Sequence, residues 1–420
     1  MRMKVPVNNL KTIAALIVTC LAATLATLLF SVCADACARL YTAIPLLCTA
    51  LPLAGLAGWG IYRKLGLEAS WSTSRVISAV NNREHTPAVL LPAVFVATCI
   101  TLLFGGSVGK EAGALQLSVI SAEKTRAALH LDAKYSRLCM LCTLACAMAT
   151  LFGAPVAAAL FAFELVAWNI DRPWHIPVVI AASLAAAFLV HALGIPVIAH
   201  PVTALPLNAD TVGMCLLIGS CACVGGAVYC IGIRAAREAL GTSVRRQVIA
   251  IIGAGAAVAA LMIGGHTFAV AGTGVVQLNA ALAGELSSPF FALKLLVTVV
   301  LLGCGFKGGE FLPMLTIGAT LGAWLACTCG IDAASAATAN LVGFYAAFGM
   351  ACFMATCTNC PFAAAALAVE FCGPAVAAAV IPAALLCSIL TSGFSLYDNT
   401  RAITPVTLHS PRTRPSKRHV

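Results

Sequence analysis

Charged residues are scarce in this sequence. Asp, Glu, Lys and Arg make up 10% of the 420 residues, whereas hydrophobic residues make up 61%. A soluble domain carries roughly a quarter charged residues, so this chain cannot cover its surface with charge. The short alternating segments of a membrane β-barrel are also lacking. Apolar runs long enough to cross a bilayer as helices recur along the chain, and they predict an all-α polytopic membrane protein.

Evenly spaced cysteines in polar loops are absent as well. The twenty cysteines fall in apolar runs such as "MCLLIGSCACVGG", which begins at Met214. This distribution argues against a disulfide framework and favours small packing residues. The sequence contains no HExxH motif, and "CAC" at 221–223 lacks partners at zinc-ligand spacing. We therefore expect neither a metal nor a cofactor.

Positive charge gathers at the two ends of the chain. The net charge is +10, and the terminal basic residues are Arg2, Lys4, Lys11, Arg401, Arg412, Arg414, Lys417 and Arg418. Basic residues that flank membrane spans favour the cytoplasmic side, so both termini are predicted to be cytoplasmic. The basic tail is interpreted as a lipid-facing anchor rather than a nucleic-acid-binding segment. Residues 12–31 resemble a signal-peptide core, but more spans follow and the run is long enough to cross the bilayer.

These features predict three segments. Residues 1–11 are a cytoplasmic segment, residues 12–400 a transmembrane domain, and residues 401–420 a basic tail too short to be a soluble domain. Glycine and proline interrupt the apolar runs repeatedly, as at Gly153–Pro155, Gly308–Pro313, Pro361 and Gly373–Pro374. Such interruptions are typical of broken or re-entrant helices, which membranes tolerate where the backbone lines an enclosed cavity.

An internal repeat divides the transmembrane domain into halves of about 12–200 and 205–400. "MATLFGAPVAAALFAFEL" begins at Met148 and "MATCTNCPFAAAALAVEF" begins at Met354. Each copy has a proline seven residues after its methionine and a glutamate nine residues after that proline. "GGSVGKEAG" precedes the first copy and "GFKGGEFLP" precedes the second. Repeats with broken segments at matching places indicate a transporter whose site lies at the repeat interface.

"GGSVGKEAG" permits several interpretations. It fits the G-x-S-x-G pattern of a hydrolase nucleophile, but that motif needs a preceding strand and a partner histidine for Ser107. It fails as a phosphate-binding loop, because three residues separate its glycines and Glu111 follows the lysine. A third interpretation is an anion site, where a helix starting near Glu111 points its positive N-terminus at a halide. A carboxylate there would compete with the anion and swing away when protonated. The alternative is a structural ion pair between Glu111 and Lys110.

These segments together resemble the CLC family of anion channels and transporters. "GGSVGKEAG" resembles the family's GREG segment, "GAPVAAALFAFEL" its N-A-P-L-A-G-x-L-F-x-x-E segment, and "GGEFLP" its G-G-x-F-x-P segment. The ordered set runs from about residue 40 to residue 400. "GFKGGE" followed by "IGATLG" is similar to the bacterial fluoride branch. The resemblance implies two inverted-topology halves, a homodimer, and a place in the bacterial inner membrane.

The resemblance also implies roles for individual residues. Glu111 would be the gating glutamate that carries the proton, Glu310 a second acid specific to the fluoride branch, and Tyr397 the hydroxyl donor to the anion. For Glu310, the alternative is a structural pair with Lys307. The further anion-binding residues would be Ser72, Thr73, Ser74, Gly109, Lys110, Gly308, Gly309 and the amides around Phe311, and Gly113 would help to shape the path.

Other positions refine this assignment. Leu165 falls where chloride–proton exchangers place an internal proton glutamate, and the fluoride branch also lacks that residue. Glu164 and its repeat mate Glu370 are expected to be structural. Serines in "WSTSRVI", in contrast, are more typical of chloride-handling members. Phe394 is expected to be a lipid-facing or core residue rather than an anion contact.

The sequence thus predicts a transporter that exports a small halide, with fluoride first and chloride second, in exchange for protons. Its partners would be the halide, protons, the lipid bilayer and a second copy of the chain, with no nucleic acid. The alternatives are a chloride/proton exchanger, a passive chloride channel in which Glu111 only gates, a membrane hydrolase built on Ser107, and a structural scaffold.

Overall fold

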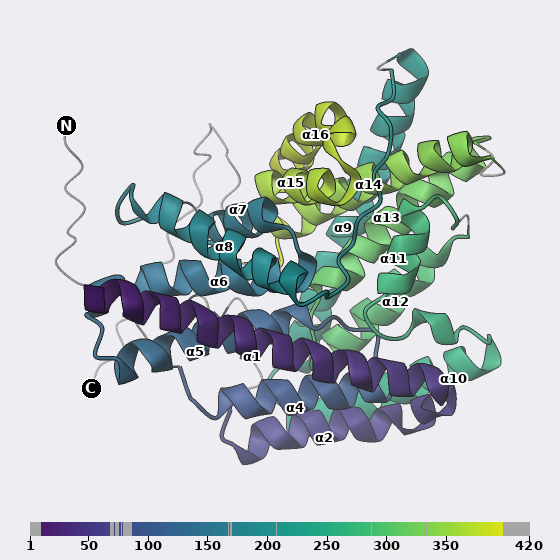
Figure 1. Ribbon diagram of the computed structural model, residues 1–420. Helices are drawn as coiled ribbons and strands as arrows, with labels where there is room; N and C mark the ends of the chain where they lie inside the picture. Colours follow the sequence, from purple (N-terminus) through teal and green to yellow (C-terminus); the bar gives the residue numbers. More distant parts are fainter. Residues whose placement is uncertain are drawn as a thin grey trace.

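The protein is a bundle of α-helices (Figure 1). The computed structural model describes residues 10–67, 71, 75–76, 78, 86–166, 168, 170–206, 208–286, 288–331 and 335–397. Within these ranges no β-strand occurs. This confirms the predicted all-α fold class.

Helices of very different lengths make up the bundle. They are α1 (Leu10–Ala43), α2 (Leu51–Lys64), α4 (Leu90–Leu103), α5 (Glu111–Ala128), α6 (Ser136–Phe152), α7 (Pro155–Leu165), α8 (His175–Ala192), α9 (Ala209–Leu240), α10 (Val244–Gly264), α11 (Val275–Leu282), α12 (Phe290–Gly303), α13 (Phe311–Thr328), α14 (Ala336–Thr358), α15 (Pro361–Cys372) and α16 (Ala377–Leu390). Short 3₁₀ turns lie at Pro45–Ala50, Ala133–Tyr135, Phe268–Val270 and Pro374–Val376.

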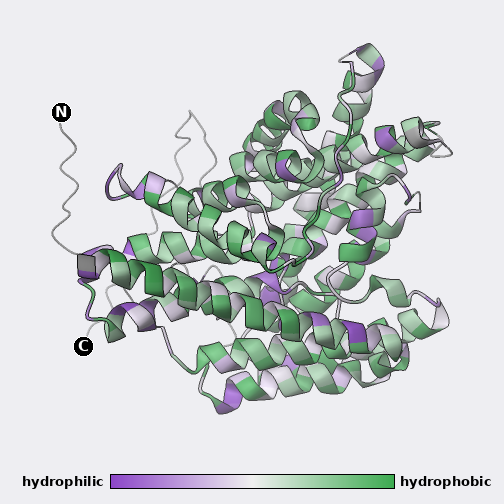
Figure 2. Cartoon of the chain, viewed as in Figure 1, coloured by the Kyte–Doolittle hydropathy of each residue, from purple (hydrophilic) through white to green (hydrophobic). Residues whose placement is uncertain are grey.

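Seven of the helical segments in the described part of the chain are long and apolar enough to span a membrane. In α13 and α14, 83% and 94% of the span is buried inside the protein, whereas only 33% is buried in α1 and α9. Two central helices are therefore shielded by outer ones. The outer helices expose apolar side chains such as Leu25 on α1 and Phe188 on α8, and Figure 2 shows that both helices consist mainly of hydrophobic residues. This arrangement suits a protein whose solvent is lipid.

The predicted breaks at Pro155 and Pro361 divide long apolar runs into pairs of helices. Gly153 ends α6 with a left-handed backbone (φ 65°), and Pro155 begins α7 one residue after Ala154. Asn359 ends α14 in the same conformation (φ 54°), and Pro361 begins α15. Glycine and asparagine tolerate this conformation, and proline fits the first turn of a helix because it needs no amide partner. Both repeat copies therefore turn in the same way.

The helices of the two halves follow one another in the same order. α4 and α5 begin at residues 90 and 111, and α12 and α13 begin 200 residues later at 290 and 311. α7 packs against α15, its counterpart in the other half. In Figure 1, α5, α6 and α8 lie to the left, and α11, α12 and α13 to the right. The exact limits of the halves remain a prediction, and the terminal segments 1–9 and 398–420 lie outside the described residues.

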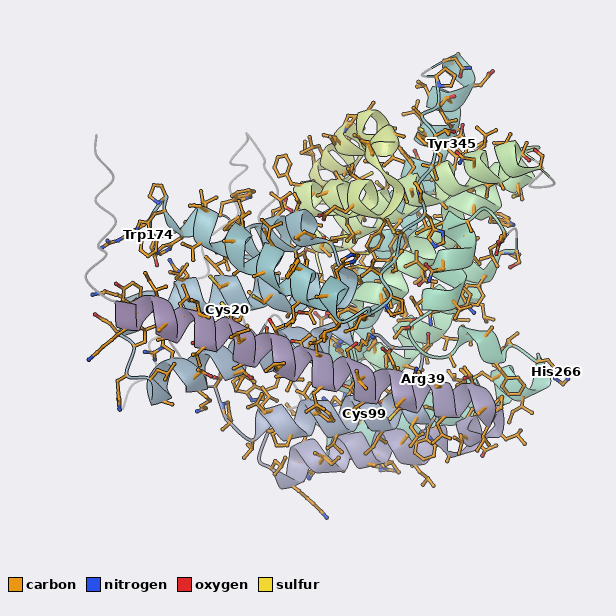
Figure 3. All side chains as sticks on the ribbon, in the orientation of Figure 1. Cys20, Arg39, Cys99, Trp174, His266 and Tyr345 are labelled. Carbon is orange, nitrogen blue, oxygen red and sulfur yellow. The ribbon has the colours of Figure 1, made fainter. Side chains whose placement is uncertain are left out.

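All twenty cysteines are free thiols. They lie within helices or at helix ends, as Cys20 on α1 and Cys99 on α4 illustrate (Figure 3). This agrees with their interpretation as small packing residues.

Candidate functional site

Two glycine-rich turns meet at the centre of the protein. One turn links α4 to α5 and the other links α12 to α13. Gly109 and Gly309 face each other in these turns and form an isolated antiparallel bridge with two N–H···O bonds of 2.6 Å. Side chains would not fit here, because a Cβ atom on Gly109 would overlap Glu111 and a Cβ atom on Gly308 would overlap Val108. The predicted site glycines therefore permit the close approach of the two turns.

Glu111 is the first residue of α5 and is fully buried. Its Oε2 atom accepts a hydrogen bond of 3.2 Å from the backbone N–H of Leu312, in the first turn of α13. The carboxylate thus lies at the N-termini of two helices that belong to different halves, where the helix dipoles favour a negative charge. Its Oε1 atom is buried and has no hydrogen-bond partner among the described residues.

The hydrogen bond from Leu312 does not by itself offset the cost of burying this carboxylate. A hydrogen bond to a charged group contributes about 1.5–3 kcal/mol, whereas removing a carboxylate from water costs several kcal/mol. The residue is therefore not explained by stability, and an intramembrane acid of this kind indicates function.

Lys110 lies beside Glu111 in the sequence, but its side chain turns away from it. The Nζ atom lies 2.7 Å from the Asp35 carboxylate and 2.8 Å from the Ser31 hydroxyl, both on α1. The structural pair between Lys110 and Glu111 is therefore not formed. The sequence analysis missed Asp35, although an acid that follows an apolar run was a signal that could have found it.

Glu310 occupies the N-cap position of α13 and is 8% exposed. The Tyr229 hydroxyl donates to the backbone carbonyl of Glu310 at 3.0 Å. Lys307 does not pair with Glu310. Its ammonium group lies over the Tyr62 ring, 4.0 Å from the centroid. Instead, the positive charge of Arg237 on α9 acts on Glu310.

Tyr397 is buried next to this centre. It is 2% exposed, and its ring meets Phe161 edge-on at a centroid distance of 6.2 Å. Arg234 holds the adjoining segment through a 2.8 Å hydrogen bond to the Ser395 carbonyl. The charges of both Glu111 and Glu310 interact with Tyr397. The three residues to which the family resemblance assigns proton and anion roles therefore gather in one region.

An apolar cavity lies beside Phe311. It has about 10 Å³ of room, close to what one water molecule requires. Its lining comes from both halves: Met148, Phe152, Ala154, Ala157, Ala158, Phe161, Phe311, Met354, Ala363 and Leu367. The repeat-mate methionines thus face the same space. The sequence analysis used them only as markers of the repeat, and their position beside the site follows from the fold.

Glu164 and Glu370 bind the backbone of each other's repeat. The Glu164 carboxylate accepts from the Phe362 and Ala363 N–H groups of α15 at 3.1 and 2.7 Å. The Glu370 carboxylate accepts from the Val156 and Ala157 N–H groups of α7 at 2.9 and 2.8 Å. Each glutamate therefore caps the N-terminus of the opposite helix. This geometry agrees with the structural role predicted for both.

The remaining predicted positions lie elsewhere. Ser72, Thr73 and Ser74 lie outside the described residues. Gly113 packs against the Phe30 ring, and Phe394 is 39% exposed at the surface. The Ser107 hydroxyl shares a 2.8 Å hydrogen bond with Thr298 and follows a helix rather than a strand. It therefore lacks the setting of a hydrolase nucleophile.

Comparisons with known proteins identify related sequences. Residues 53–393 match the family described as voltage gated chloride channel. A chloride/fluoride channel protein of Pseudomonas syringae pv. tomato is 27% identical over 356 residues, which are 82% of this chain and 75% of the relative. This long match confirms the resemblance seen in the ordered motifs.

Solved structures share the fold. A CLC-type fluoride/proton antiporter superposes with a TM-score of 0.82 at 22% identity, over 93% of this chain and 97% of that one. A slow cyanobacterial Cl⁻/H⁺ antiporter superposes with a TM-score of 0.75 at 17% identity, over 91% and 95% of the two chains. Together with the family match, this likeness identifies the chain as a multi-pass membrane protein of the CLC family of chloride channels and transporters.

Proposed function

We propose that this protein exports a small halide in exchange for protons, and that fluoride is its main substrate. The observation that carries the proposal is the buried Glu111 carboxylate, which lies where the N-termini of α5 and α13 converge. Two relatives whose names include fluoride add support for the choice of halide. Leu165, an apolar residue at the end of α7, favours the fluoride branch over the chloride exchangers.

In the proposed cycle, the Glu111 carboxylate and the halide occupy the same place in turn. Ionised Glu111 accepts the Leu312 N–H through Oε2. When a proton binds, the carboxylic acid is neutral and no longer gains from the helix dipoles. A halide then takes over the same donors, and the Tyr397 hydroxyl adds a further one. When the acid gives up its proton, the carboxylate returns and displaces the halide. One proton therefore crosses the site for each displacement of Glu111.

Glu310 is proposed to be the second acid of this cycle. It begins the helix whose first turn holds Glu111, and Tyr229 fixes its backbone through the carbonyl. Gly109, Gly308, Gly309 and the amides around Phe311 would shape the anion path between the two acids. The predicted contributions of Lys110 and of the hydroxyl donors Ser72, Thr73 and Ser74 remain part of the proposal.

A passive anion channel is the second candidate. The Pseudomonas syringae relative is named a channel, and in a channel Glu111 would gate the path without carrying protons. A chloride/proton exchanger is the corresponding alternative for the substrate, since one structural neighbour is a Cl⁻/H⁺ antiporter.

A homodimer in the bacterial inner membrane, with both termini cytoplasmic, completes the proposal. The helices α7, α8, α15 and α16 pack in a connected layer. This layer bears exposed apolar side chains, among them Phe188 at 74% and Leu390 at 66% exposure. A second copy of the layer would bury them.

Flux measurements in liposomes test the function. Fluoride and chloride efflux are recorded with an ion-selective electrode while proton uptake is followed in the same vesicles. We expect fluoride efflux to drive protons against their gradient, and Glu111→Gln to abolish this coupling. Proton-coupled fluoride efflux that survives in Glu111→Gln would contradict the gating role. Efflux without proton movement in the wild type would favour the channel.

A further inference from the structure

Lys294 is a buried cation that the proposed cycle has not used. It lies on α12 and has no exposed surface. No carboxylate forms an ion pair with it in the part of the chain that the structure describes. A lysine buried in a membrane protein without a paired acid carries a large desolvation cost, and such residues indicate function. The sequence analysis missed Lys294, although it falls inside an apolar run.

Two backbone carbonyls hold the Lys294 ammonium group. Nζ donates to the Val270 carbonyl at 2.9 Å and to the Gly272 carbonyl at 2.7 Å. Gly272 in turn donates its N–H to the Gly106 carbonyl at 3.0 Å, in the glycine-rich turn before α5. The ammonium group is thus fixed against the turn that leads to Glu111.

A second set of contacts links Lys294 to the start of α13. A Cβ atom on Gly274 would lie 3.1 Å from Lys294 Cε and 2.8 Å from Thr316 Oγ1, so these groups are neighbours. Thr316 bonds to the carbonyls of Gly274 and Leu312 at 3.1 and 3.0 Å. The N–H of Leu312 is the donor to Glu111. Lys294 therefore lies close to the turn before α5 and to the N-terminal part of α13.

Lys294 lies close enough to Glu111 for their charges to interact. Among the described acids, Glu111 is the one that interacts electrostatically with Lys294. The other half of the protein does not repeat this charge: the position 200 residues earlier, on α4, is Val94. In contrast, the next position on the same helix face is a threonine in both halves: Thr298 on α12 and Thr98 on α4. The positive charge of Lys294 thus distinguishes this face of α12 from the corresponding face of α4.

We propose that Lys294 is the fixed countercharge of the anion site, a positioning residue that attracts the halide to the N-termini of α5 and α13. The Val270 and Gly272 carbonyls hold the ammonium group in place. When Glu111 swings away, the halide becomes the anion that balances Lys294. This inference rests on the proposed function, because it assumes that a halide replaces the carboxylate.

The test compares three variants of Lys294. Lys294→Met removes the charge and both hydrogen bonds, Lys294→Gln removes the charge but keeps an N–H donor, and Lys294→Arg keeps the charge. Lys134→Met serves as the control, because Lys134 lies on an exposed 3₁₀ turn and pairs with Asp132. For each variant, the fluoride concentration that gives half-maximal efflux and the maximal rate are measured in liposomes. Fluoride binding to the purified protein is titrated by calorimetry.

Loss of the charge should weaken anion binding more than it slows turnover. We expect the half-maximal fluoride concentration and the Kd to rise about tenfold in Lys294→Gln, which corresponds to one charge-assisted interaction. The arginine variant should stay close to the wild type, and so should Lys134→Met. Because Lys294→Met leaves two carbonyls without donors and can fail to fold, the comparison of the glutamine and arginine variants decides the result.

Two outcomes would overturn the proposal. Wild-type affinity in Lys294→Gln would show that Lys294 only anchors the backbone, and weak binding in both Lys294→Gln and Lys294→Arg would show that charge is not the property required. Wild-type liposomes that carry neither fluoride nor chloride would instead reject the proposed function. The calorimetric titration would then still report on Lys294, and a wild type that binds no halide would reject its role as well.

Discussion

Gly109 and Gly309 donate their amide N–H groups to each other's carbonyl oxygens at 2.6 Å. The two residues lie 200 positions apart, each in the turn before the helix that its half contributes to the site. The bridge brings the first turn of α13 against Glu111, which lies two residues after Gly109. The proposed anion site is therefore built by contact between the halves rather than within either one.

Substitution of Gly109 should damage transport while leaving the helices intact. A Cβ atom at this position would overlap the Glu111 carboxylate, so Gly109→Ala must displace the group that is proposed to gate the path. We expect fluoride efflux to fall by at least about tenfold, because catalytic geometry tolerates little misplacement. Gly60→Ala is the matched control, since nothing lies near its Cβ position on α2. Removing a helical glycine should stabilise the protein by about 0.5–1 kcal/mol. Wild-type efflux in Gly109→Ala would refute the assignment.

The reciprocal caps should matter for stability rather than for transport. Glu164→Gln and Glu370→Gln each replace a two-point carboxylate cap with one amide oxygen and remove its charge. We expect each to lower the free energy of unfolding by about 1–3 kcal/mol. Glu164→Gln should be the more costly, because Glu164 is 4% exposed and Glu370 is only partly buried. Denaturation in detergent measures this. Unchanged stability combined with lost proton coupling would instead place these residues in the transport path.

The pair of Lys110 and Asp35 should contribute little. Asp35 remains 47% exposed, so we expect a coupling free energy of only about 0.2–1 kcal/mol in a double-mutant cycle of Lys110→Met and Asp35→Asn. Both single variants should slow fluoride efflux to a similar, small extent, because each releases the same contact. A much larger loss in Lys110→Met than in Asp35→Asn would mean that Lys110 acts on the anion directly.

Glu310 and Lys307 should behave independently. The structure separates them, since the Lys307 ammonium group lies on the Tyr62 ring. We expect Glu310→Gln to reduce proton-coupled fluoride efflux by at least about tenfold, the size of an acid–base contribution or more. Lys307→Met, which loses a cation–π contact of about 0.5–1 kcal/mol, should transport nearly as well as the wild type. Equal losses in the two variants would support the structural pair that the sequence left open.

Much of the fold was predictable because its signals are local. Pro155 and Pro361 begin helices, and the sequence around Gly153 already indicates the break before the first of them. Glu111 was identifiable for the same reason, since an acid between glycines at a helix start combines two local features. The repeat also identified Glu164 and Glu370 as matching positions of the two copies.

The partners of these residues were not predictable, because they depend on how the helices pack. A structural pair of Lys110 with Glu111 was one alternative from the sequence, yet Lys110 reaches across to Asp35 on α1. Lys294 belongs to none of the motifs, and the contacts of Gly272 with Gly106 and of Gly274 with Thr316 bring it to the site. The cap that each glutamate forms on the other's helix likewise requires the halves to be packed together.

The reciprocal helix caps formed by Glu164 and Glu370 resemble a contact between two identical subunits. In a symmetric dimer, residue i of one copy contacts residue j of the other, and the reverse contact follows automatically. Here one chain makes both contacts, from α7 to α15 and from α15 to α7. Each half supplies one glutamate and one helix N-terminus, and each of these binds its counterpart in the other half. One covalent chain thus makes within itself the reciprocal contact that a symmetric dimer makes between two copies.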